Sequence, residues 1–191
     1  MTLGDFSTAD FKAGALRVAS KFSEAQLETD KHKLTIDDLA AIDDVTLSRG
    51  ANSILLLPLN WRSNGEEEIY AESTDSIAKL FSQENIPSES LSPLTAQTIL
   101  KQERYADWVA PTLFVSSLLL SQNQVAASIT LNVIANYVTD QFKGIKDDPA
   151  VKLQIVHTTL KGKTTRKISY EGPASGLAEV AKVVAEFRAE K

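Results

Sequence analysis

The distribution of apolar and charged positions along the chain shows one long gap in charge. From Trp108 to Thr139 no residue is Asp, Glu, Lys or Arg, although these four types make up 24% of the chain. Apolar residues recur at helical spacing in 112–121 and again in 125–142, and the polar run 122–124 separates the two segments. The pattern predicts a central buried helical hairpin that supplies a core or a subunit contact.

A stretch without charge can also face lipid. A membrane-spanning helix needs about 20 predominantly apolar residues, whereas amide and hydroxyl side chains such as Gln122 and Asn132 interrupt this stretch. Each amide in lipid would require a hydrogen-bond partner. A buried helical pair therefore explains the pattern better, and insertion of 108–142 into a membrane on activation is the alternative.

The C-terminal third has the clearest periodicity. Val151, Leu153 and Ile155 alternate with polar residues, which predicts a half-buried strand, and 164–170 reads as the returning strand of a hairpin. The last segment carries one apolar face at helical spacing: Leu177, Val180, Ala181, Val184 and Phe187. This region predicts a β-hairpin packed with a terminal helix.

The N-terminal half combines helical patterns with short apolar runs. The expected elements are a helix over 5–29, a second helix starting at Thr35, a buried strand over 53–59, a short strand over 68–70, a helix from Ser73 to Gln83, a connector or short strand over 84–95 and a helical approach over 96–107. We predict an α+β fold with an N-terminal helical and small α/β part. The regions would be 1–95 and 96–191, or one continuous domain.

Composition and charge exclude several classes of function. The chain has 191 residues, no cysteine and a net charge of −5. Residues 1–107 hold 18 acidic and 10 basic side chains, and residues 140–191 hold 7 acidic and 10 basic ones. The acidic excess argues against non-specific nucleic-acid binding. Without cysteine and without a basic, then apolar, N-terminal leader, the expected location is the cytoplasm, with a peripheral membrane location as the alternative.

The chain lacks the side-chain groupings that mark common catalytic and metal sites. Two isolated histidines, His32 and His157, do not make a zinc site, and His157 is best interpreted as structural. Gly162-Lys163-Thr164 imitates the end of a phosphate-binding loop, but the required glycine is replaced by His157 and a strand follows instead of a helix. We therefore expect no catalytic residue, no metal and no cofactor.

Three groups of residues are candidates for binding. The interface candidates in the uncharged stretch are Leu113, Leu119, Leu120, Val125, Ile129, Val133 and Tyr137. The candidates for contact with an anion or an acidic partner lie on one predicted hairpin: Lys161, Lys163, Arg166 and Lys167. The candidates for a ligand loop follow the strand over 53–59: Asn60, Trp61 and Arg62, of which the last two could stack on and pair with an anionic ligand.

The leading hypothesis is a non-enzymatic assembly or interaction protein. Its partner would be a second copy of itself or another protein subunit of a larger bacterial-type complex, and a place in bacterial defence is compatible with it. The first alternative is a membrane-active effector that inserts 108–142. The second is an enzyme or binder of a small anionic ligand that uses the loop after 53–59.

Overall fold

The computed structural model describes residues 27–29, 32–40, 42–62, 67–92, 98–100, 108–123, 125–159 and 164–186. The helix expected over 5–29 lies outside these residues apart from 27–29, which form a strand. Lys161 and Lys163 also lie outside them. The fold is α+β.

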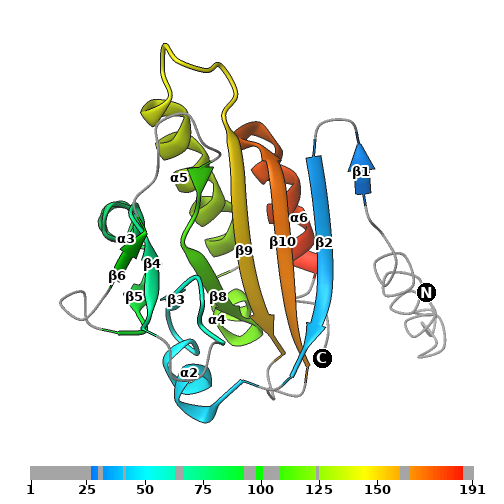
Figure 1. The fold of residues 1–191 in the computed structure, drawn as a ribbon. Coiled ribbons are helices and arrows are strands. Elements are labelled where there is room, and N and C mark those ends of the chain that lie inside the picture. The colour runs from blue at the N-terminus through cyan, green and yellow to red at the C-terminus, as the bar shows by residue number, and fades with distance from the viewer. Residues whose placement is uncertain are drawn as a thin grey trace, which may run out of the picture.

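The strands of the described residues are β1 (Leu27–Thr29), β2 (His32–Leu39), β3 (Ile54–Leu57), β4 (Ile69–Ala71), β5 (Ser88–Ser90), β6 (Thr98–Leu100), β7 (Trp108–Val109), β8 (Thr112–Ser116), β9 (Ala150–Thr158) and β10 (Thr165–Pro173). The main sheet has the order β1-β2-β10-β9-β8-β3-β5, and β7 also pairs with β9 (Figure 1). Strands β4 and β6 form a separate parallel pair.

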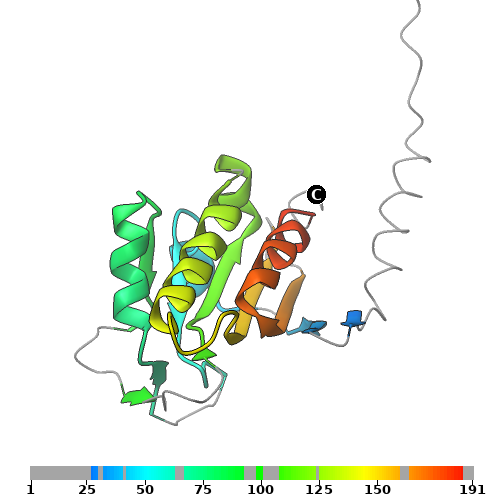
Figure 2. The same ribbon diagram turned by 90° about the horizontal axis from the view of Figure 1, so that it is seen from above.

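The described helices are α2 (Asp44–Arg49), α3 (Thr74–Gln83), α4 (Ser117–Gln122), α5 (Ala126–Gln141), the 3-10 turn η2 (Ala174–Gly176) and α6 (Leu177–Glu186). Helices α3, α5 and α6 lie on the same side of the main sheet (Figure 2). The other side of β2, β10 and β9 faces the viewer in Figure 1. At one end of this side Val156 and Leu39 pack in an apolar cluster with Leu47 of α2, whereas no described helix covers the other end, where Lys33, Glu171 and Lys152 lie. We call this side the open face.

Strands from both halves of the chain are interleaved in the main sheet. The early strand β2 pairs antiparallel with β10, and β3 pairs antiparallel with β8. The longest ladder is the antiparallel hairpin of β9 and β10, which packs with α6 as the alternating pattern of 151–170 predicts. Backbone hydrogen bonds thus join the regions 1–95 and 96–191 within one sheet.

Two helices expected from the sequence are strands in the structure. Residues 35–39 belong to β2, because pairing with β10 satisfies their backbone and their acidic side chains meet the basic side chains of that strand. Residues 112–116 form β8, and α4 begins only at Ser117. The side chain of Ser116 caps α4 by accepting a hydrogen bond of 3.1 Å from the Leu119 N–H. In both segments long-range pairing overrides the local helical pattern.

A third expectation, a helical approach over 96–107, is wrong where the structure describes it. Residues 98–100 form β6, which runs parallel to β4. The remaining expectations over 53–59, 68–70, 73–83 and 84–95 are confirmed as β3, β4, α3 and β5.

The uncharged stretch forms the centre of the core. Strand β8 is buried at all five positions, and α5 packs its apolar side against α6 and α3. A second, smaller cluster lies on the opposite face and includes Leu55, Phe114 and Val156, with Leu47 of α2 beside it. Helix α2 approaches so closely that a Cβ at Gly50 would lie 2.2 Å from the Phe114 ring, so this position requires glycine.

Candidate functional site

The open face of β2, β10 and β9 carries polar side chains in register. One row runs across the three strands through Lys33, Glu171 and Lys152, because Glu171 pairs with both lysines in the two ladders. Two residues further along, a second row consists of Thr35, Ser169 and Gln154. Side chains directly opposite each other in antiparallel strands lie on the same face. The open face therefore presents one charged row beside one uncharged hydrogen-bonding row.

These two rows form the floor of a cavity of about 280 Å³. Its walls include Leu59, just after β3, and Val109 and Ala110 between β7 and β8. We call this space, with its two polar rows and these walls, the open-face cavity. Ligand sites commonly measure about 300–1,000 Å³ and are mostly apolar. The open-face cavity is slightly smaller, and most of the residues that line it have polar or charged side chains, which suits a small molecule with polar groups.

Thr112 of β8 also lines the open-face cavity. The residue is fully buried, and its hydroxyl has no hydrogen-bond partner among the described residues. An unsatisfied buried hydroxyl costs about 1–3 kcal/mol. Such a group is rare in a native fold. Because Thr112 is fully buried, a ligand could reach its hydroxyl only if neighbouring atoms moved.

The charged row alternates in sign. The register places Glu28 of β1 opposite Lys33, Lys33 opposite Glu171, and Glu171 opposite Lys152. The Lys152 ammonium lies 3.3 Å from the Glu171 carboxylate, and both side chains are about half exposed. A half-exposed ion pair contributes roughly 0–1 kcal/mol. Glu171 can therefore exchange between partners at little cost in free energy.

The predicted ligand loop after β3 is held by its own contacts. Asn60 donates from its amide to the Glu67 carbonyl at 2.8 Å and accepts from the Ile69 N–H at 2.9 Å. The Arg62 guanidinium lies 4.7 Å from the Trp61 ring centroid and donates to the Ala40 carbonyl at 2.7 Å. Trp61 and Arg62 thus stack on each other. The loop contributes to the cavity through its neighbour Leu59.

The two described residues of the predicted basic cluster, Arg166 and Lys167, lie on opposite faces of the sheet. Arg166 is opposite His157 on the helix-covered face, whereas Lys167 is opposite Val156 on the other face. Arg166 lies 3.4 Å from Asp38, and Lys167 lies 3.5 Å from Asp37. Both cations have internal partners and point in opposite directions, so the two do not make one anion site.

The predicted interface residues fall into three groups, which are buried, partly buried and exposed. Leu113, Leu119 and Leu120 are buried inside the single chain, which accounts for the absence of charge around them. Three residues of α5 are partly buried against the same core: Ile129, Val133 and Tyr137, whose ring contacts Trp108. Val125 is 56% exposed, and Leu118 of α4 is 36% exposed.

No helix among the described residues is both long enough and apolar enough to cross a membrane. Insertion of 108–142 as a helical hairpin would also require removal of β8 from between β9 and β3.

His157 forms a buried pair with a serine that the sequence pattern did not connect to it. Its Nε2 lies 3.0 Å from the Ser117 hydroxyl, and both residues are almost completely buried on the helix-covered face. Burial, and secondly the positive charge of Arg166, lowers the pKa of His157 to about 4. A neutral imidazole beside a serine has the composition of a nucleophile and its base. Because neither group is accessible to solvent, this pair joins α4 to β9 instead of serving a substrate.

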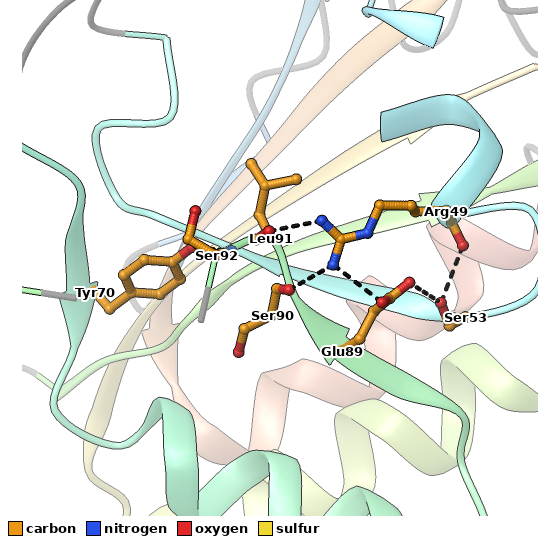
Figure 3. Close-up of polar contacts among 7 residues, drawn as sticks. All are labelled: Arg49, Ser53, Tyr70, Glu89, Ser90, Leu91 and Ser92. Atoms are coloured by element: carbon orange, nitrogen blue, oxygen red, sulfur yellow. Dashed lines mark hydrogen bonds and ion pairs between the residues drawn. The ribbon is translucent and has the colours of Figure 1, made fainter. Parts of the chain in front are cut away.

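Arg49 holds the edge strand β5 in place (Figure 3). Its guanidinium donates to the carbonyls of Leu91 and Ser90 at 2.6 and 2.7 Å and pairs with Glu89 at 3.0 Å. The hydrogen bond from Arg49 lowers the pKa of Glu89. Ser53 completes the cluster through a hydrogen bond of 3.1 Å to the other carboxylate oxygen. These groups satisfy one another's hydrogen-bonding capacity, so the cluster joins α2 to β5.

The residues of the open-face cavity were not candidates in the sequence. Lys152 and Gln154 were recognised as outward positions of a strand, but the partners of that strand could not be read from spacing. The two rows arise only when β2, β10 and β9 are aligned. Thr112 was placed in a helix, so its relation to the sheet was also missed.

Among the described residues no group of three or more His, Cys, Asp or Glu side chains could hold a metal ion. No family model, curated protein or solved structure matches this chain.

Proposed function

We propose that this chain is a non-enzymatic binding protein that takes a small polar molecule into the open-face cavity. The observation that carries the proposal is a cavity whose floor is a row of hydroxyl and amide groups beside a row of charged groups. The cavity lies on the face of β2, β10 and β9 opposite α5 and α6, so a ligand can reach it without displacing these helices.

Binding is favoured over catalysis by the arrangement of reactive groups. The Ser117–His157 pair is buried away from the cavity on the other face of the sheet. The cavity itself offers lysine, glutamate and uncharged hydrogen-bonding side chains. These groups can orient a ligand through hydrogen bonds and charge.

The proposal is tested by a screen in which small polar molecules stabilise the protein against thermal unfolding. Ser169→Trp would fill the cavity, and Ser82→Trp adds the same ring on the exposed side of α3 as the matched control. We expect a compound that raises the melting temperature of the wild type and of Ser82→Trp, and has no effect on Ser169→Trp. Equal stabilisation of all three proteins would show that the ligand binds elsewhere.

A second candidate function is assembly with another copy or another subunit. The observation that favours it is the exposure of two large apolar side chains, Leu118 and Val125, around the junction of α4 and α5. Measurement of the native mass at micromolar concentration tests this candidate. Val125→Glu should shift an oligomer toward the monomer, whereas Val45→Glu, at an exposed position of α2, should leave the mass unchanged.

A further inference from the structure

We infer that the ligand of the open-face cavity is a small organic anion, bound through a carboxylate or phosphate group to Lys33 and Lys152, with Glu171 as an internal competitor. The inference rests on the proposed binding function and adds the charge class of the ligand. It follows from the two lysines that line the cavity on either side of Glu171.

The central carboxylate can neutralise only one of its two neighbours at a time. In the structure Glu171 pairs with Lys152 at 3.3 Å. Lys33 is exposed and has no ion pair with a described side chain, and the register places Glu28 of β1 opposite it. The strands of the two lysines are separated by one strand, so their backbones are about 10 Å apart. An anionic group can therefore pair with Lys33 first and compete with Glu171 for Lys152.

The uncharged row explains why the ligand should be more than a simple ion. Thr35, Ser169 and Gln154 lie immediately beside the charged row. An anion held by the lysines would direct the rest of the molecule over this floor. Hydroxyl or carbonyl groups on that part of the ligand could then exchange hydrogen bonds with these three side chains.

Replacing Glu171 and replacing Lys33 should change the affinity for the ligand in opposite directions. If the ligand is an anion, Glu171→Gln removes a competing and repelling carboxylate, and affinity should rise about 3-fold to 10-fold. Lys33→Gln removes one of the two cations that line the cavity, and affinity should fall on the order of 10-fold. A cationic ligand would reverse both signs, because it would bind Glu171 and be repelled by the lysines.

The experiment is a titration of the full chain, followed by amide chemical shifts, with four probes. Succinate and inorganic phosphate are the anions, glycerol is the neutral probe and putrescine is the cation. Lys182→Gln and Glu186→Gln, both on α6, make the same charge changes on the helix-covered side and serve as controls. The expected result is binding of succinate or phosphate at the cavity, weakened by Lys33→Gln, tightened by Glu171→Gln and unchanged in both controls.

Two results would overturn the inference in distinguishable ways. Binding of glycerol or putrescine at the cavity without binding of either anion would contradict the anionic class while leaving the binding function intact. If no probe shifts the amides of the cavity, and the thermal screen also finds no ligand that Ser169→Trp blocks, the binding function fails together with the inference.

Discussion

The two faces of the β2–β10–β9 sheet are built from the same strands but have different tasks. On the helix-covered face, Ile155, Ile168 and Leu34 pack under α5 and α6 and hold the fold together. On the open face, the neighbouring residues of those strands are polar and form the cavity floor. Successive side chains of a strand point to opposite faces. Adjacent residues of the same strand therefore contribute either to the stability of the core or to the lining of the cavity. Mutations on the helix-covered face should therefore destabilise the fold, whereas mutations on the open face should change only ligand binding.

The largest contrast is expected between adjacent residues of β9. Ile155→Ala removes a buried side chain and should lower the free energy of unfolding by about 2–5 kcal/mol. Gln154→Ala, one step along on the open face, should change it by less than about 0.5 kcal/mol. Equilibrium unfolding in urea measures both values. Similar losses for the two variants would mean that the open face is part of the packed core.

The next largest effect is a pH dependence of the free energy of unfolding, which comes from His157 on the helix-covered face. The pKa of His157 is about 4 in the folded chain, below its ordinary value of 6.5. Between these values the unfolded chain binds the proton and the folded chain does not, so stability falls as pH decreases from about 6.5 to 4. The loss from this group should reach about 2 kcal/mol by pH 5.

His157→Gln is the matched variant for this effect, because an amide can bond to Ser117 but does not titrate. Urea unfolding at pH 7 and pH 5 should show a smaller drop in stability for the variant than for the wild type. An identical drop in both proteins would assign the pH dependence to other groups.

A smaller effect of opposite sign is expected at Thr112. Thr112→Val replaces an unsatisfied buried hydroxyl with a methyl group of similar size, so the ligand-free protein should gain about 1 kcal/mol of stability. Thr130→Val is the control, since the Thr130 hydroxyl is buried but donates to the Ala126 carbonyl at 2.6 Å. The control should not be stabilised. A destabilised Thr112→Val protein would show that the hydroxyl is already satisfied in the free protein.

The smallest effect is expected at the ion pair between Asp37 and Lys167 on the open face. These atoms are 3.5 Å apart and partly exposed, so Asp37→Asn should cost less than about 0.5 kcal/mol. The difference should shrink further in 1 M salt, where the screening length is about 3 Å. A loss above 1 kcal/mol that persists in salt would indicate a structural role for this pair.

The sequence predicted those parts of the fold that depend on local pattern. Residues 151–155 alternate strictly, and 125–142 follow a helical period, so β9 and α5 were found. Residues 35–39 and 112–116 also fit a helical spacing over a few positions, and their strand state depends on partners far away in the chain. Short apolar segments cannot be assigned by periodicity alone when pairing decides the outcome.

The candidate site was harder to predict than the fold for the same physical reason. Lys33, Gln154 and Thr112 come from three distant segments, and none of them belongs to a motif. What brings them together is the register of the strands. The candidates that are recognisable in the sequence have partners within the chain: Arg62 stacks on Trp61, and Arg166 pairs with Asp38.

The most direct test of the account is the amide chemical-shift map of the wild type titrated with succinate. Binding at the open-face cavity should concentrate the shifts at Lys33, Gln154, Ser169 and Thr112 and leave α3 and α6 unaffected. Saturable shifts confined to the junction of α4 and α5, with none around the open-face cavity, would contradict the assignment of binding to the open face.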